Sequence, residues 1–339
     1  MDSKFAVTKE TKVLTDKGYF HIEELSSFKF VNIWNGEKFV EVKVKKVSGW
    51  GHEPNMMIKI DDVEVEIKKK AGRSYAQICT INLNNSHFIN CAYYSKLLIK
   101  TDYSIPISLP VIDGTVDDEK GTYTHGFLLN ECSLIKKFST YLIPKHKLHI
   151  LDVIRKEKVN EVESKLVGKS GVNWINFNPY KLYNINQYTS DLNSYIPDYN
   201  SKIKYKLNFL AGLLDSIGNF SIEGNVVIPL KKEKQRRNVF YLLQTLGVSA
   251  ILRPKYLYFS GYYIKKLKEL GLKTYHFQLD IIEGFQKLSG EREMTLENRK
   301  FLSGDDKIKV RKINCNDQVS HVYTFENYDG RCVLNGILC

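Results

Sequence analysis

Residues 6–83 alternate apolar and polar positions in short runs, a pattern typical of β-strands with one buried face. A Gly-bearing turn at 16–18 joins the first two runs, and Glu23-Glu24-Leu25 starts a short helical turn. No part of this stretch carries a helical period of useful length, so the pattern predicts an all-β module of short, curved strands. The runs lie at 11–15, 19–22, 39–47, 57–60 and 75–83.

A different pattern begins at Leu210, where an apolar run carries small residues every three to four positions. Gly212 and Ser216 would let a second helix approach closely along one side. Asp215 would then lie at the seam between the helices, where a carboxylate can hold a metal ion. The run predicts one half of a helix pair that delivers acids to a shared site. An ordinary buried helix that ends at Gly218 is the alternative.

The pattern after Gly218 predicts a hairpin, a helix, two strands and a second helix. The hairpin, 219–230, turns at Gly224-Asn225. The first helix stops at Gly247, and the second, Lys-rich helix covers 262–270. With the helix at 210–218, the order of these elements is α-β-β-α-β-β-α. Residues 121–200 are harder to assign to helices and strands and are rich in Lys, Asn and Tyr. The first helix takes its apolar period from Val239, Leu242, Leu243 and Leu246, and the strands lie at 248–253 and 256–260.

The chain of 339 residues is long enough for two or three domains, and its 43% hydrophobic and 12% aromatic residues indicate a folded protein. Fifty Lys and Arg against 38 Asp and Glu give a net charge of +12, which favours a polyanionic partner over a merely soluble basic protein. No apolar stretch reaches transmembrane length, and the first 20 residues lack a signal-peptide core. We therefore expect no membrane partner and an intracellular protein, cytoplasmic or nuclear.

The six cysteines are scattered and form no Cys-x-x-Cys pair. This spacing predicts reduced thiols in a reducing compartment and no structural zinc. The eight histidines show no ligand spacing either. The cysteines are Cys79, Cys91, Cys132, Cys315, Cys332 and Cys339.

Both ends of the chain resemble inteins, the self-splicing protein elements. Residues 6–15, followed by Gly18 and 22–25, are similar to the opening intein block: a Cys or Ser, a few variable residues, Thr-x-Val-x-Thr, a Gly turn and Ile-x-x-Leu. Residues 321–327 and 333–338 resemble the closing blocks, a tyrosine-bearing strand and an Asn-Gly-Ile hairpin. The resemblance implies an all-β Hint horseshoe formed by both chain ends.

Two polar connectors mark where an insertion would interrupt that horseshoe. Residues 92–120 contain Pro106 and Pro110 and then an acidic, Gly-bearing run, and 290–320 form a polar return segment. We expect the N-terminal part of the Hint domain at 1–110, an insertion at 111–300 and the C-terminal part at 301–339.

The intein resemblance also implies catalytic residues. Splicing begins when a thiol or hydroxyl of the first residue attacks the preceding carbonyl, which needs no cofactor. A histidine about 80 residues later, in a Thr-x-x-His block, assists the cleavage. His87 matches that histidine, and Asn84 stands where Thr is usual. A buried structural histidine is the alternative for His87.

The sequence departs from the intein pattern at both reacting ends. Ala6 occupies the nucleophile position and cannot attack, and Ser3 lies too early for the block spacing. Splicing is therefore expected to be inactive as written, through a deliberate substitution or natural decay. At Cys339 the family would continue to a terminal Asn, so either residues follow or the terminus is altered. The 333–338 run resembles inteins of ribonucleotide reductase large subunits, which makes flanking host segments the expected protein partners.

The insertion resembles LAGLIDADG homing endonucleases. Residues 126–133 are similar to a first, weakened LAGLIDADG helix end and 210–218 to a clearer second one, about 85 residues apart. The resemblance implies an α/β domain of two αββαββα half-domains with a saddle on double-stranded DNA. It implies Mg²⁺ held by one acid from each helix, the first being Glu131. The second acid position falls on Ile217. Asp215, the remaining metal candidate, points about 160° away, so we expect little or no double-strand cutting.

Basic residues that follow the second motif are candidates for DNA contacts. Those at 231–237 and on the 262–270 helix would meet phosphates, and those at 253 and 255 lie on strands of the predicted saddle. A solvated helix face is the alternative for each. We expect a monomer. The DNA-binding candidates are Lys231, Lys232, Lys234, Arg236, Arg237, Arg253 and Lys255.

Three functions compete at this point: an intein with an embedded homing endonuclease, a free-standing LAGLIDADG endonuclease or maturase, and a catalytically dead DNA-binding protein. Hint-like blocks at both ends favour the first over the second. The missing acid at Ile217 keeps the third open.

Overall fold

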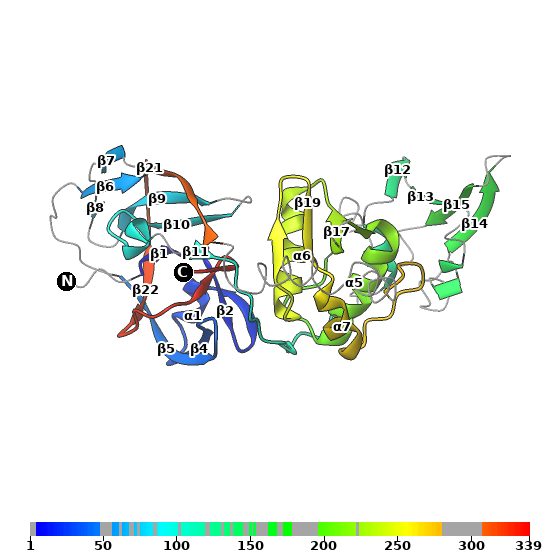
Figure 1. Cartoon of the computed structure of the whole chain (residues 1–339), viewed down its shortest axis with the longest axis horizontal. Helices are drawn as coiled ribbons and strands as arrows, with labels where there is room; N and C mark the ends of the chain where they lie inside the picture. The colour runs from blue at the N-terminus through cyan, green and yellow to red at the C-terminus, as the bar shows by residue number, and fades with distance from the viewer. Residues whose placement is uncertain are drawn as a thin grey trace. The chain divides into compact units, whose positions relative to one another are not determined.

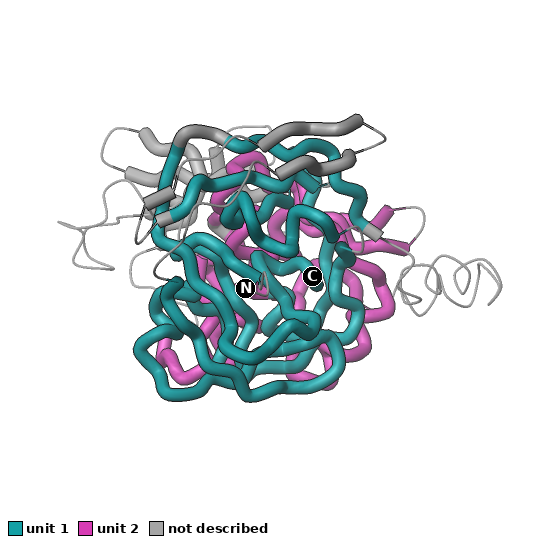
Figure 2. Tube along the Cα trace, turned by 90° about the vertical axis from the view of Figure 1, so that its left-hand side faces the viewer, with its two compact units in different colours: residues 1–112, 243–254, 299–339 teal, residues 113–242, 255–298 magenta. Residues whose placement is uncertain are grey.

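The computed structural model divides the chain into two compact units. Unit 1 comprises 1–112, 243–254 and 299–339, and unit 2 comprises 113–242 and 255–298 (Figure 2). The division into a Hint domain and an insertion at 111–300 stays a prediction. The structure describes residues 5–47, 56–60, 63–67, 71–72, 75–83, 87–100, 103–118, 123–129, 132–135, 138–144, 149–150, 152–153, 162–167, 172–177, 196–221, 224–279 and 307–339.

Within the described residues, unit 1 is built on one 14-stranded antiparallel sheet (Figure 1). The strand order is β20-β11-β24-β23-β2-β4-β5-β22-β1-β10-β9-β21, with β3 beside β2 and β8 beside β9. The strands are β1 (Val7–Thr8), β2 (Lys12–Thr15), β3 (Gly18–His21), β4 (Val31–Trp34), β5 (Phe39–Lys46), β8 (Ala71–Gly72), β9 (Tyr75–Leu83), β10 (Phe88–Ala92), β11 (Tyr103–Ser104), β20 (Lys307–Ile308), β21 (Val310–Ser320), β22 (Val322–Glu326), β23 (Val333–Leu334) and β24 (Ile337–Leu338).

The two ends of the chain share this sheet. β1 pairs with β22 through Val7 and Tyr323, and β2 pairs with β23 through Val13 and Leu334. These four residues are buried, because every second side chain of a half-buried strand faces the core. Pairing of the chain ends was predicted. The sheet is large and antiparallel, and the Hint horseshoe itself stays a prediction.

The other elements in the described part of unit 1 are short. The helical turn predicted at Glu23 is α1 (Ile22–Leu25), and a 3₁₀ turn, η2 (Lys96–Ile99), follows β10. A separate two-stranded sheet pairs β6 (Met56–Ile60) with β7 (Val63–Ile67). The prediction of an all-β module without long helices is confirmed for the described part of this region.

One cysteine prediction is wrong. Cys79 on β9 and Cys315 on β21 form a disulfide, although all six thiols were expected to be reduced. The two residues are 236 positions apart in sequence and meet only because β9 and β21 are neighbouring strands, a pairing that spacing alone does not reveal. Cys91, Cys332 and Cys339 are free and buried.

Within the described residues, two short four-stranded sheets each follow a helix in sequence (Figure 1); their strands lie in unit 2 except β18 (Ala250–Leu252), which falls in the 243–254 segment of unit 1. Their strand orders are β12-β13-β15-β14 and β16-β17-β19-β18, so both sheets place the first, second, fourth and third strand side by side. The elements are α2 (Tyr123–Leu128), β12 (Cys132–Ile135), β13 (Phe138–Pro144), β14 (Val162–Val167), β15 (Val172–Phe177), α5 (Ile203–Ile217), β16 (Asn219–Phe220), β17 (Asn225–Pro229), α6 (Glu233–Thr245), β18 (Ala250–Leu252), β19 (Tyr256–Ser260) and α7 (Tyr262–Glu269).

The second half of this series has the order α-β-β-α-β-β-α that the sequence predicts. Its first helix begins earlier than the motif, at Ile203, and the apolar residues predicted for α6 are fully buried. The first half repeats the strand order although its sequence shows no clear period. Among the described residues, no helix is both long and apolar enough to cross a membrane.

Candidate functional site

α2 and α5 are in contact through their backbones. A Cβ atom on Gly126 would lie 1.9 Å from the carbonyl oxygen of Phe209, and one on Gly212 would lie 1.9 Å from the carbonyl oxygen of Tyr123. Real Cβ atoms essentially never come this close to a backbone atom. The sequence prediction of a close helix pair that includes Gly212 therefore holds, and Gly126 supplies the other side.

The two contacts are related by an approximate symmetry. Tyr123 precedes Phe209 by 86 residues, and Gly126 precedes Gly212 by the same 86. An interface in which i meets j and the equivalent of j meets the equivalent of i is the signature of a two-fold axis. Together with the repeated sheet order, this makes unit 2 an internal duplication.

The same offset of 86 residues pairs Glu131 with Ile217. Glu131 lies outside the described residues, as does Asn84. Ile217 is the last residue of α5 and is partly exposed. An apolar side chain cannot ligate a cation, and no group of three or more His, Cys, Asp or Glu side chains within the described segments is arranged to hold one. At the Mg²⁺ site that the LAGLIDADG resemblance implies, the second acid position is therefore apolar, and the first lies outside the described residues.

Asp215 is an anchor for a neighbouring segment. Its carboxylate accepts hydrogen bonds from the Tyr123 hydroxyl at 2.7 Å and from the backbone N–H groups of Tyr275, His276 and Phe277 at 2.7, 2.9 and 2.5 Å. The side chain is 1% exposed. Both oxygens are engaged, so the geometry favours a structural role. Metal binding by Asp215 stays a prediction.

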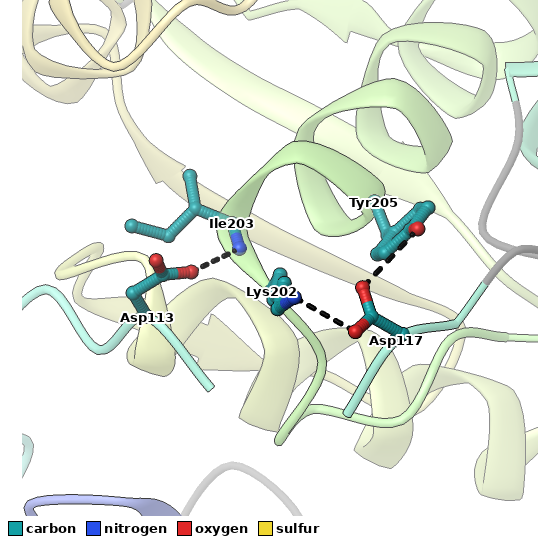
Figure 3. Close-up of polar contacts among 5 residues, drawn as sticks. All are labelled: Asp113, Asp117, Lys202, Ile203 and Tyr205. Carbon is teal, nitrogen blue, oxygen red and sulfur yellow. Dashed lines mark hydrogen bonds and ion pairs between the residues drawn. The ribbon is translucent and has the colours of Figure 1, made fainter. Parts of the chain in front are cut away.

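The N-terminus of α5 is held by an acidic segment that precedes α2 in sequence (Figure 3). The Asp113 carboxylate accepts a hydrogen bond from the backbone N–H of Ile203 at 2.8 Å and so caps α5. Asp117 accepts from the Lys202 ammonium at 2.7 Å and from the Tyr205 hydroxyl at 3.4 Å. The hydrogen bond from Lys202 lowers the pKa of Asp117. This segment fixes where α5 begins.

The predicted DNA-binding residues differ in how far their side chains are exposed. Arg236 is 6% exposed and donates to the carbonyls of Leu230 and Lys231 at 2.5 and 2.6 Å, so it stabilises the start of α6 and does not face solvent. Arg237 forms an ion pair with Glu233 at 2.8 Å. Arg253 is partly exposed. The exposed cations are Lys231, Lys232, Lys234 and Lys255.

One face of the β16–β19 sheet is buried and the other is open. On β17 and β19, Val226, Ile228, Leu257 and Phe259 have no exposed surface, since they alternate toward the core. On these two strands the opposite side chains at 225, 227, 229, 256 and 258 are partly or fully exposed, whereas Ser260 and all three residues of β18 are buried. This open face carries amide and tyrosine side chains at Asn219, Asn225, Tyr256 and Tyr258.

In unit 1, both backbone groups of Ala6 are held by the end of β10 and by Ser95. The N–H of Ala6 donates to Ser95 Oγ at 3.1 Å, and its carbonyl accepts from the N–H of Ala92 at 2.8 Å. Ser95 is fully buried. Nothing in the sequence singles out Ser95, because a serine ahead of a short helical turn is an ordinary N-cap and carries no further signal.

Cys339 shares neighbours with the start of the chain. Cys91 lies opposite Val7 in the β1–β10 pair and also acts electrostatically on the Cys339 thiol. The Lys100 ammonium lies 5.1 Å from the ring centre of Phe5 and acts on the same thiol. Burial raises the pKa of Cys339 well above its usual value. Cys91 and Lys100 thus lie near the start of the described chain and also act on the Cys339 thiol.

The Asn335 side chain links three segments of unit 1 that lie far apart in sequence. Asn335 Oδ1 accepts the N–H of Lys12 at 2.9 Å, and Asn335 Nδ2 donates to the carbonyl of Phe88 at 3.2 Å. Asn335 and Gly336 both have positive φ, 49° and 81°, as a two-residue hairpin turn requires. The predicted Asn-Gly hairpin is confirmed.

His87 and Ala6 lie at opposite ends of β10. His87 lies just before β10 and is 3% exposed, whereas Ala6 lies beside Ala92 at the other end of that strand. The two ends of such a strand are about 17 Å apart. A catalytic role for His87 stays a prediction.

Comparison with known proteins gives structural neighbours only. No family model matches the chain, and no curated protein matches it. A structure of the homing endonuclease I-DmoI with DNA and Mn is 15% identical, with a TM-score of 0.35, and the match covers 46% of this chain and 98% of that chain. Full-length DUF199/WhiA from Thermatoga maritima is 14% identical, with a TM-score of 0.35 over 59% of this chain and 72% of that chain. The N-terminal LAGLIDADG domain of WhiA is 16% identical, with a TM-score of 0.33 over 48% and 87%.

Proposed function

We propose that this chain is a protein-splicing element whose unit 1 carries the splice junctions and whose unit 2 is an inserted double-stranded-DNA-binding unit of LAGLIDADG type. The observation that carries the proposal is the pairing of the two ends of the chain in one sheet, β1 with β22 and β2 with β23. Splicing joins the segments that flank an element, so its two junctions have to lie close together.

The proposed chemistry begins at residue 6. A thiol or hydroxyl there attacks the carbonyl of Phe5, the bond between that carbonyl and the residue 6 nitrogen breaks, and the nitrogen gains a proton. Ser95 would hold that nitrogen in place through the hydrogen bond from its N–H. The methyl group of Ala6 has no nucleophile, so the chain as written stops before this step.

The first step is tested by restoring a nucleophile. A reporter is fused ahead of residue 1 of the Ala6→Cys chain, which is then treated with hydroxylamine, a reagent that cleaves thioesters and leaves disulfides intact. We expect release of the reporter, and none from the native Ala6 chain. Adding Ser95→Ala should slow release about tenfold, the value of one hydrogen bond. No release from the Ala6→Cys chain would contradict the proposal.

DNA binding by unit 2 rests on the duplicated helix pair and the open sheet face beside exposed lysines. A four-stranded sheet with an open polar and aromatic face can follow a DNA groove, and lysines around it would neutralise phosphates. We expect the full chain to shift a pool of random duplexes in a gel, more strongly at low salt. With Ile217 at the second acid position, we expect no double-strand cutting when Mg²⁺ is added.

A free-standing DNA-binding protein of LAGLIDADG type is the second candidate. The absent nucleophile at Ala6 favours it, because such a protein would have no use for residue 6. The reporter assay separates the two: DNA binding without any reporter release from the Ala6→Cys chain would support this candidate.

A further inference from the structure

Three cysteines lie in one row across neighbouring strands. Cys79 of β9 is directly opposite Cys91 of β10 on one side and directly opposite Cys315 of β21 on the other. Side chains of directly opposite residues in an antiparallel sheet point to the same face, with Cβ atoms about 4.5–5.5 Å apart. All three sulfur atoms therefore lie on one face of the sheet, with Cys79 in the middle.

The two pairs in this row are of different kinds. Backbone hydrogen bonds join Tyr93 to Gln77 and Leu83 to His87, and the pattern repeats every second residue, so Cys79 and Cys91 form a hydrogen-bonded pair. Such pairs have Cα atoms about 5.5 Å apart, a distance that disulfides commonly span. Cys79 and Cys315, with Cα atoms 4.0 Å apart, hold the existing disulfide.

The three cysteines also differ in burial and bonding. Cys91 is a free thiol with no exposed surface, and Cys79 is equally buried. Cys315 is partly exposed and lies on β21, the last strand of the sheet order. The disulfide is therefore flanked by a free thiol on its buried side.

We propose that Cys91, Cys79 and Cys315 form a thiol–disulfide exchange site. The Cys91 sulfur, as thiolate, attacks the Cys79 sulfur; the Cys79–Cys91 bond forms, and the Cys79–Cys315 bond breaks. Cys315 leaves as a thiolate and takes up a proton equivalent to the one that Cys91 lost. The exchange is internal and consumes no oxidant or reductant.

The Cys79–Cys315 and Cys79–Cys91 disulfides have different consequences for unit 1. The Cys79–Cys315 bond ties β21, which follows the insertion, to β9, which precedes it. The Cys79–Cys91 bond releases that covalent link and leaves Cys315 as a partly exposed thiol open to small thiol compounds. It also occupies the Cys91 sulfur, whose hydrogen bond with Ser95 lies next to the amide of Ala6. Burial raises the pKa of Cys91 well above its usual value, so the exchange is expected to be slow.

Peptide mapping tests the proposal on the full native chain. Trypsin leaves Cys79 and Cys91 together in fragment 74–96 and Cys315 in fragment 313–331. The protein is equilibrated in mixtures of reduced and oxidised glutathione, or incubated without glutathione, then quenched with acid, blocked with N-ethylmaleimide and digested. We expect two species: 74–96 cross-linked to 313–331, and 74–96 closed on itself beside a maleimide-labelled 313–331.

Two variants sharpen the result. Cys91→Ser should abolish the closed fragment completely, whereas Cys332→Ser, which removes a buried free thiol outside the row, should leave both species in place. Cys315→Ser should leave the closed fragment as the product of oxidation. The proposal is overturned if the closed 74–96 fragment appears at no glutathione ratio in the native chain, or if it never forms without glutathione, since internal exchange needs no co-reactant. Neither result depends on whether the chain splices.

Discussion

Lys206 lies near the start of α5 with none of its surface exposed. Burial lowers its pKa from 10.5 to about 8, and the carboxylates of Asp113 and Asp198 oppose that shift. Since the folded-state pKa is the lower one, the unfolded chain binds more protons between about pH 8 and 10.5, and stability rises with pH across that window. Below pH 8 the cost of the buried charge is fully present.

Lys206→Met should therefore stabilise the protein at pH 7, by about 1–3 kcal/mol in the free energy of unfolding. The difference from the native chain should shrink as pH rises from 8 toward 10, where native Lys206 is neutral in the folded state. Urea titrations at several pH values measure this difference, with the exposed Lys204→Met as the control. A difference that stays constant from pH 7 to 10 would contradict the lowered pKa.

Asp215→Asn tests the anchoring role of Asp215. An amide has a single acceptor oxygen and would turn an NH₂ group toward backbone N–H donors, so we expect a loss of about 2–4 kcal/mol in stability. Asp113→Asn, at the exposed cap of α5, should cost about 1 kcal/mol or less. Denaturant unfolding measures both, and an Asp215→Asn chain as stable as the native protein would rule out the anchor.

The structure gives Asp215 and Arg236 contacts that the sequence does not reveal. Asp215 and Arg236 were predicted to meet metal and DNA, because an acid in a small-residue helix and an arginine in a basic run carry those signals. The structure places both side chains inside, bonded to backbone groups of distant or neighbouring segments. Which way such a side chain points depends on tertiary contacts that local spacing does not contain.

At the scale of elements, the helix pair is the strongest sequence signal that the structure bears out. Gly126→Ala and Gly212→Ala each place a methyl group against a carbonyl of the other helix, so the helices have to move apart. We expect each variant to lose about 2–4 kcal/mol in stability, despite the better helix propensity of alanine. Thermal unfolding is the measurement.

Asn208→Ala is the matched control, because it changes an exposed position of the same helix. It should unfold within about 0.5 kcal/mol of the native chain. If the two glycine variants behave like this control, α2 and α5 do not pack through their backbones.

Helices and strands could be predicted from the sequence where a single hydrophobic period, helical or alternating, dominates the segment. α6 and α7 show a clear apolar face, and β5 and β9 alternate, so their limits lie close to those predicted. The strands of 121–200 were not assigned, since no period distinguishes them. β9 and β21 are neighbours in the sheet but lie far apart in sequence. The sequence therefore did not predict the disulfide between them.

At the scale of the whole molecule, the exposed lysines of unit 2 should set the salt dependence of DNA binding. Replacing Lys231, Lys232 and Lys234 together by glutamine should weaken binding and reduce the slope of log K against log salt by up to about 3. Fluorescence anisotropy with a labelled duplex, at 50 to 300 mM salt, gives the slope. The matched control replaces Lys17, Lys29 and Lys38 of unit 1, and an equal effect from that control would contradict a specific role for the lysines at 231–234.

The central claim is that unit 1 joins the segments that flank it. The direct measurement places the Ala6→Cys chain, extended by its native downstream residues, between two reporter proteins and separates the products on a gel. We expect ligated reporters and a freed insert near 39.3 kDa. A precursor that stays whole, while the same chain still binds duplex DNA, would contradict splicing and leave DNA binding as the function of the molecule.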